Sequence, residues 1–124
     1  MGEDYKILIA EDDDSMGRLI SYKLKSAGYD IKVLKEGDLV LTELQKNKYH
    51  LLILDLMLPG MNGVQILKKL KEKSIEVEVL VLSAKSQEKD IVQALELGAD
   101  EYITKPFRPD ELLVIIREKK PYHI

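Results

Sequence analysis

Short apolar runs alternate with amphipathic stretches almost from one end of the chain to the other, and this alternation restricts the fold more than any other feature. The runs occupy residues 7–10, 31–34, 51–54, 77–82 and 102–103. Each is followed by a stretch with apolar residues at helical spacing. Strictly alternating strands and helices indicate a parallel sheet covered by helices on both faces. We therefore expect an α/β fold with five parallel strands.

The ends of the predicted helices carry the residues that start and stop helices. The first helix is expected from about residue 15 to 27, with Gly28 as its stop. Asp13, Asp14 or Ser15 could cap its N-terminus. The last helix is expected to begin at Pro109, with acids in its first turn. Apolar residues at helical spacing include Met16, Leu19, Ile20 and Leu24 in the first helix and Ile91, Val92, Leu95 and Leu97 in the fourth.

The length of 124 residues fits one domain, expected over residues 1–124 with a core of about 5–119. Right-handed crossovers leave few strand orders for five such units. One of them is the flavodoxin-like order 2-1-3-4-5, which binds ligands outside the carboxyl ends of strands 1 and 3. A functional site is therefore expected at that edge of the sheet.

Acidic residues follow the first and third predicted strands. Glu11 and Asp12 come after the first strand and Asp55 after the third, so neighbouring strands would bring the three together. Several carboxylates with open positions suit Mg²⁺, which takes one or two of them plus a phosphate. The alternative is that single acids at strand ends only cap the following helices, and we expect this for Asp13 or Asp14.

The fourth and fifth predicted strands also end in polar side chains. Ser83 closes the fourth strand and Lys105 follows the fifth. A hydroxyl and an ammonium at the same edge could bind phosphoryl oxygens. Taken alone, Ser83 could be a helix cap and Lys105 a solvated lysine. Together with the acids, they favour a site for a phosphoryl group.

Composition excludes several classes of protein. Without cysteine the chain has no disulfide and no thiolate chemistry. The net charge of −3 comes from mixed lysines and acids, so we expect no direct contact with nucleic acid. No apolar run approaches the roughly 20 residues of a membrane span, and the start is too charged for a secretory signal. We expect a cytoplasmic protein that does not bind membranes.

Four motifs, each at a predicted strand end, resemble the receiver domains of bacterial response regulators in two-component signalling. The resemblance runs from about Tyr5 to Lys119. Any one motif is weak, but four in order are highly specific. They are residues 9–13 (IAEDD), 55–63 (DLMLPGMNG), 83–84 (SA) and 98–107 (GADEYITKPF).

The resemblance implies a role for each residue of this edge. Asp55 would take a phosphoryl group from a histidine kinase and become an acyl phosphate. Asp12 would bind Mg²⁺ directly, as would Asp55 and the backbone carbonyl of Met57, while Glu11 would act through water. Lys105 would pair with a phosphoryl oxygen, and its peptide bond to Pro106 is expected to be cis.

The resemblance also implies a switch rather than an enzyme that turns over external substrates. Ser83 would move toward the phosphoryl group and Tyr102 would rotate inward behind it. That motion would alter the face formed by the fourth helix, fifth strand and fifth helix. An output domain or a partner protein would respond to the altered face.

The segment around the fifth strand resembles the branch whose receivers precede winged-helix DNA-binding domains. Receivers of that branch usually dimerise through charged pairs across the fourth and fifth helices, so the resemblance makes a homodimer through this face one possible state and leaves the oligomeric state open. Ile91 and Ile115 stand where the branch often has arginine, so the usual charged pairs are in question. Either residue could belong to the core or to an apolar patch for another partner. The chain could be a stand-alone regulator or one part of a longer protein.

Three rival functions fit the sequence less well. An aspartyl phosphatase would need a second acid two residues after its nucleophile, where this chain has Met57. A flavin binder would need a phosphate-binding first loop, and the acids at 11–14 would repel a phosphate. A purely structural relative of receivers would not be expected to retain every site residue.

Overall fold

The computed structural model describes residues 5–119 and contains the predicted alternation of strands and helices. Five strands and five helices follow one another along the chain. Their bounds are β1 Lys6–Ala10, α1 Asp14–Ser26, β2 Asp30–Leu34, α2 Gly37–Lys46, β3 Leu51–Asp55, α3 Gly63–Glu72, β4 Glu78–Ser83, α4 Glu88–Glu96, β5 Glu101–Thr104 and α5 Pro109–Lys119. No helix among residues 5–119 is long and apolar enough to span a membrane.

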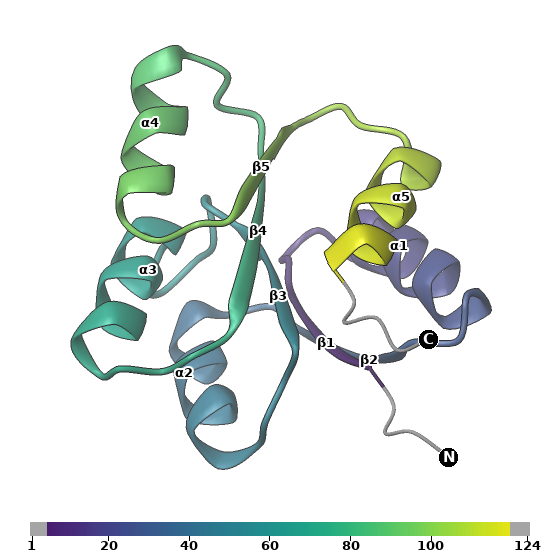
Figure 1. The fold of residues 1–124 in the computed structure, drawn as a ribbon, viewed down its shortest axis with the longest axis horizontal. Coiled ribbons are helices and arrows are strands. Elements are labelled where there is room, and N and C mark those ends of the chain that lie inside the picture. The colour runs from purple at the N-terminus through teal and green to yellow at the C-terminus, as the bar shows by residue number, and fades with distance from the viewer. Residues whose placement is uncertain (1–4, 120–124) are drawn as a thin grey trace.

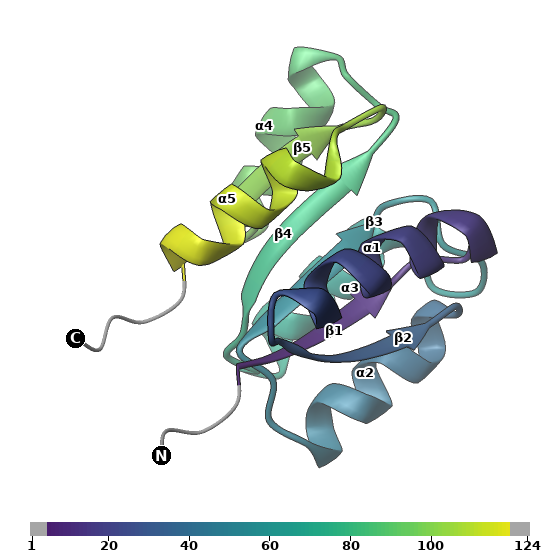
Figure 2. The ribbon, with the colours of Figure 1, turned by 90° about the vertical axis from the view of Figure 1, so that its right-hand side faces the viewer.

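The strands form one parallel sheet in the order β2-β1-β3-β4-β5, which confirms the predicted topology. Helices α2, α3 and α4 cover one face of this sheet, and α1 and α5 cover the other (Figure 1). Seen from the second face, α1 and α5 lie in front of the strands, whose carboxyl ends share one edge (Figure 2). The carboxyl ends of β1, β3, β4 and β5 therefore lie at the same edge of the sheet.

Strand β3 lies at the centre of the sheet, and all its residues are buried. Its side chains alternate between two hydrophobic cores because successive residues of a strand point to opposite faces. Leu52 and Leu54 pack with α2 and α3, while Leu51 and Ile53 pack with α1 and α5. A strand covered on both faces must be apolar throughout, which explains its run of leucine and isoleucine.

The helix ends are fixed by local hydrogen bonds. Asp13, rather than Asp14 or Ser15, caps α1 by accepting the backbone N–H groups of Ser15 and Met16. Asn62 and Gln65 form a reciprocal capping box at the start of α3. Each cap lies just after a loop from a strand end, so it also fixes where the loop leaves the sheet.

Helix α4 buries less of its apolar surface than its sequence suggests. Only Ala94 is fully buried in α4, whereas Val92 is 42% and Leu95 is 44% exposed. Helical spacing places apolar residues on one side of a helix, but it does not say how much of that side the sheet covers. The outer side of α4 therefore presents apolar groups to solvent.

Candidate functional site

The three acids expected to converge do so at the carboxyl edge of the sheet. Glu11 follows β1 and is 2% exposed, Asp55 ends β3 and is 5% exposed, and Asp12 is exposed beside them. One carboxylate oxygen from each lies within 4.8 Å of the others. The adjacency of β1 and β3 brings them together. Among the described residues, no other group of three potential ligands gathers in this way.

Lys105 neutralises part of this cluster. Its Nζ donates to Glu11 Oε1 at 3.0 Å and to Asp55 Oδ2 at 3.1 Å. The peptide bond between Lys105 and Pro106 is cis, as predicted. Burial lowers the pKa of Lys105, but the hydrogen bonds to Glu11 and Asp55 and the charges of both carboxylates together raise it above its usual value. Lys105 therefore carries its positive charge between two buried carboxylates.

Glu11 and Asp55 are held by matching pairs of hydrogen bonds. The second oxygen of Glu11 accepts the backbone N–H of Asp13 at 3.2 Å, and Asp55 Oδ1 accepts that of Met57 at 2.9 Å. Each side chain thus bonds Lys105 with one oxygen and the backbone two residues later with the other. This arrangement fixes both carboxylates in orientation before any ligand binds.

The crowding of charge in the cluster affects the pKa of Glu11. Burial raises the pKa of Glu11, the hydrogen bond from Lys105 lowers it, and the charge of Asp55 raises it again. The net direction is upward, because the low polarity of the site and a second carboxylate both disfavour the charged form. A bound cation would relieve that repulsion.

Ser83 and Tyr102 meet at the backbone of Lys85. The fully buried Ser83 accepts the Lys85 N–H through Oγ at 3.1 Å, and the Tyr102 hydroxyl donates to the Lys85 carbonyl at 2.7 Å. Burial raises the pKa of Tyr102, a hydrogen bond with Ser83 lowers it, and the charge of Asp90 raises it, with a net rise. The segment after β4 therefore connects the two residues assigned to switching.

The register of β4 and β5 places Ser83 beside Lys105. Ser83 pairs with Thr104, and the Lys105 N–H donates to the Ser83 carbonyl at 2.8 Å. The hydroxyl expected to bind a phosphoryl oxygen and the lysine expected to pair with one are thus on adjoining strand ends. The structure thus brings Glu11, Asp12, Asp55, Ser83 and Lys105 to one edge of the sheet, with Met57 two residues after Asp55.

The donors at this edge suit a magnesium ion. Glu11, Asp12 and Asp55 offer oxygen ligands only, and Mg²⁺ prefers oxygen and keeps several waters. The exposed position of Asp12 leaves one side of the cluster open to water and to a phosphate. The acid cluster could therefore hold a divalent cation.

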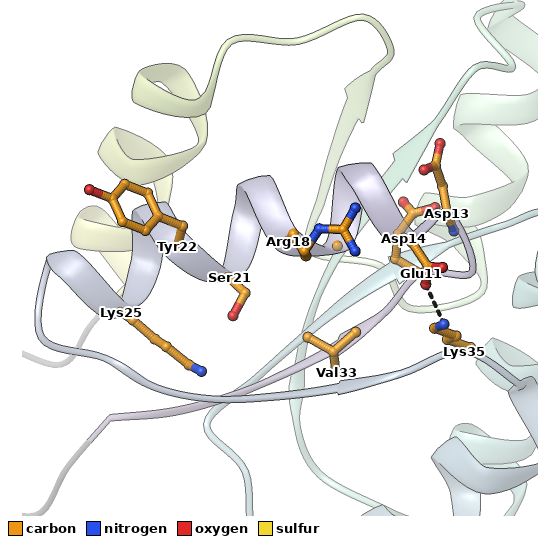
Figure 3. Close-up of a pocket in the computed structure, with 10 residues that line it drawn as sticks. Glu11, Asp13, Asp14, Arg18, Ser21, Tyr22, Lys25, Val33 and Lys35 are labelled. Carbon is orange, nitrogen blue, oxygen red and sulfur yellow. Dashed lines mark hydrogen bonds and ion pairs between the residues drawn. The ribbon is translucent and has the colours of Figure 1, made fainter.

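A hollow of about 520 Å³ lies along α1 and β2 and shares Glu11 with the acid cluster (Figure 3). Gly17 and Val33 line it, and an ion pair between Asp14 and Lys35 lies near one end. Its charged side chains balance one another in sign, so the hollow favours neither anions nor cations. They are Arg18, Lys25 and Lys35 against Glu11, Asp13 and Asp14.

Two parts of the site were missed from the sequence. The first is the bond of Lys105 to Glu11, since sequence reasoning gave Lys105 only a future phosphoryl partner. The second is the Lys85 backbone, which joins Ser83 to Tyr102. Backbone groups carry no signal in the sequence, but the position of Lys85 two residues after Ser83 fits the local turn that the bond closes.

Comparison with known protein families and structures agrees with the motifs. The family described as "Response regulator receiver domain" matches residues 7–117. The alkaline phosphatase synthesis transcriptional regulatory protein PhoP of Bacillus subtilis is 40% identical over 107 residues, covering 86% of this chain and 45% of that protein. The transcriptional regulatory protein DltR of Streptococcus agalactiae is 42% identical over 112 residues, covering 90% of this chain and 50% of that protein.

Solved structures of receiver domains superpose closely on this fold. The receiver domain of the Francisella response regulator 1452 matches with a TM-score of 0.90 and 32% identity, covering 94% of this chain and 96% of that one. The BeF3-activated DrrB receiver domain matches with a TM-score of 0.85 and 31% identity, covering 94% and 97%. The chain spans about half the length of the curated relatives it matches.

Proposed function

This chain belongs to the response regulator receiver domain family, and on that premise we propose that it is a switch operated by phosphorylation of Asp55. The donor is a histidine kinase, and Mg²⁺ is held by Asp12, Asp55 and the Met57 carbonyl, with Glu11 acting through water. The observation that carries the proposal is the burial of Asp55 at the end of β3 against the Lys105 ammonium. The Met57 N–H and the Lys105 ammonium hold this carboxylate in a fixed orientation.

The chemistry needs little from the chain beyond positioning and charge. A carboxylate oxygen of Asp55 forms a bond to phosphorus as the phosphorus–nitrogen bond of the phosphohistidine breaks, and the released imidazole takes up a proton. Lys105, already beside Asp55, offsets negative charge on the phosphoryl oxygens. Bound Mg²⁺ supplies further neutralisation of that charge.

The hydrogen bonds of Ser83 and Tyr102 to Lys85 support a connection from Asp55 to the face formed by α4, β5 and α5. Once a phosphoryl group is on Asp55, Ser83 exchanges its bond with the Lys85 N–H for one to the phosphoryl group. Tyr102, bonded to the same residue, then leaves the Lys85 carbonyl and turns inward. The surface formed by α4, β5 and α5 changes as a result. An output domain or partner protein that binds this surface would detect the change.

The chain is proposed as a phosphoacceptor rather than an enzyme for external substrates. Met57 occupies the position two residues after Asp55 and has no acidic proton to give a leaving group. Its side chain is 59% exposed beside the site. Chemistry at Asp55 is therefore limited to its own phosphorylation and dephosphorylation.

Homodimerisation through α4, β5 and α5 would have to differ from the pattern expected for the winged-helix branch. Ile115 is partly buried and packs against the core beneath α1 and α5, and Ile91 is partly buried on α4. This position favours the core assignment for Ile115. A homodimer through this face would therefore depend on contacts other than arginine pairs at 91 and 115.

The test is phosphorylation by a small-molecule acyl phosphate in the presence of Mg²⁺, followed by intact-mass measurement. We expect wild type to gain one phosphoryl group and Asp55→Asn to gain none. Asp30→Asn, at the start of β2 and the opposite edge of the sheet, is the control and should match wild type. Phosphorylation of Asp55→Asn at the wild-type rate would exclude Asp55 as the acceptor.

A further inference from the structure

The loop from Leu56 to Asn62 joins the acceptor strand β3 to α3 and is held at both of its ends. Gly63, the first residue of α3, donates its N–H to the Leu56 carbonyl at 3.0 Å, and this bond joins the two ends of the loop. In the middle, the Leu58 side chain is 5% exposed and anchors the loop in the core. Met57, two residues after Asp55, lies between Leu56 and Leu58.

A third contact to this loop comes from a distant part of the chain, the first residue of α2. Gly37 N–H donates to the Pro59 carbonyl at 3.2 Å. A Cβ atom placed on Gly37 would lie 1.7 Å from the Met61 carbonyl oxygen and 2.7 Å from its carbon. Both are backbone atoms, so they could not move aside without moving the loop. The close approach of α2 to the loop therefore requires a residue without a side chain.

The helix itself does not need glycine at this position. Gly37 is a helical residue and its φ is not in the left-handed region, so alanine fits its conformation and is the better helix former. The next residue, Asp38, also faces the loop, since its Oδ2 would lie 3.1 Å from a Cβ on Gly60. The demand for glycine thus comes from the loop.

We propose that Gly37 is a positioning residue for the phosphorylation site. Its hydrogen bond and close contact hold the Pro59–Met61 backbone against α2, and through it the Met57 backbone two residues before Pro59. Met57 gives Asp55 its N–H bond and, under the proposed function, gives Mg²⁺ its carbonyl. The inference rests on that proposed function and adds a residue from outside the four motifs.

The test is the Gly37→Ala variant, with Mg²⁺ affinity measured by an NMR titration of the backbone amides. Added bulk at Gly37 pushes the loop away from α2, so we expect the Kd for Mg²⁺ to rise about tenfold, as for other residues that orient ligands indirectly. The metal-free amide signals of Met57 and Gly60 should shift as well. A purely structural role would change the urea midpoint of the metal-free protein and leave the Kd within twofold of wild type, which would overturn the inference.

Gly17→Ala is the matched control. Gly17 is also helical, in α1, but a Cβ there meets only Val33 Cγ1 at 3.5 Å, an ordinary contact. We expect its Kd for Mg²⁺ to stay within twofold of wild type. An equal loss of affinity in both variants would assign the effect to helix substitution in general and overturn the role of Gly37.

A measurement on wild type covers the case in which Gly37→Ala does not fold. If Mg²⁺ binding and the Gly37 contact stabilise each other, Mg²⁺ must slow hydrogen exchange at the Gly37 amide. Unchanged exchange at Gly37 with saturating Mg²⁺ would overturn the inference while leaving the proposed function intact. Absence of Mg²⁺ binding by wild type would instead overturn the metal site on which both depend.

Discussion

At the level of residues, the central feature of the site is the Lys105 ammonium, which two buried carboxylates share. Lys105 bonds both Glu11 and Asp55, so the site contains one positive charge for two buried negative ones, and Asp12 adds a third acid at the surface. Such a site is short of positive charge before any ligand arrives. This imbalance is what makes a divalent cation favourable there.

The same imbalance predicts opposite titration shifts in two variants of the metal-free protein. Asp55→Asn removes a charge that raises the pKa of Glu11, so this pKa should fall. Lys105→Met removes a hydrogen bond and a charge that lower it, so the pKa of Glu11 should rise. Carbon NMR of the Glu11 carboxyl group during a pH titration measures both. Shifts in the same direction in the two variants would contradict the shared-ammonium arrangement.

At the level of elements, one carboxylate on α2, that of Glu43, accepts hydrogen bonds from three neighbouring side chains. Glu43 accepts the Tyr49 hydroxyl at 2.6 Å, Asn47 Nδ2 at 3.0 Å and Lys32 Nζ at 3.2 Å. The bond from Tyr49 is the largest cause that lowers the pKa of Glu43, burial opposes it, and the bonds from Lys32 and Asn47 lower it further. Glu43 thus links α2 both to β2 and to the segment before β3.

Tyr49→Phe should therefore destabilise the protein in a pH-dependent way. The folded pKa of Glu43 lies below its usual value of 4.5, so its stabilisation is complete above that pH and is lost as pH falls through the folded pKa. We expect a cost of about 1–2 kcal/mol at pH 7 that shrinks toward pH 3, measured by urea unfolding. Tyr22→Phe, at a tyrosine 74% exposed, is the control and should cost less than about 0.5 kcal/mol. An equal cost of Tyr49→Phe at both pH values would contradict this account.

The elements also show which parts of the fold the sequence could predict. The run from Leu51 to Leu54 is apolar on both faces, as a parallel strand at the centre of a covered sheet must be, and the alternation with helical stretches made the central place of β3 predictable. Gly28 follows the end of α1 as predicted and has a positive φ, and Gly98 follows the end of α4 in the same conformation. The exposure of Val92 and Leu95 did not follow, because it depends on how α4 sits on the sheet.

For the site, sequence reasoning placed the residues but not the contacts among them. Side chains at the ends of parallel strands share an edge, so Glu11, Asp55, Ser83 and Lys105 could be brought together from strand order alone. The approach of Gly37 to the Met61 carbonyl could not, since it depends on the distance between a helix start and a distant loop. No residue type marks a backbone oxygen that must be approached closely.

At the scale of the whole molecule, the acid cluster lies at the carboxyl ends of two strands whose side chains belong to both hydrophobic cores. Strands β1 and β3 contribute to both cores and to the cluster, so repulsion among the carboxylates acts on the elements that hold the two layers together. A cation at this edge would stabilise the folded state as well as support phosphorylation of Asp55. The thermal stability of the whole domain should therefore change when a cation binds at the acid cluster.

We expect Mg²⁺ to raise the melting temperature of the whole domain. A ligand at ten times its Kd that binds only the folded state adds about 1.4 kcal/mol, which corresponds to roughly 5 °C for a domain of this size. Asp12→Asn should remove most of this increase, because it deletes the exposed ligand of the cluster. Without Mg²⁺ the same variant should melt at or slightly above the wild-type temperature, since it removes a negative charge beside Glu11 and Asp55. Calorimetry with and without Mg²⁺ separates the two effects, and a full Mg²⁺ response in Asp12→Asn would place the ion elsewhere.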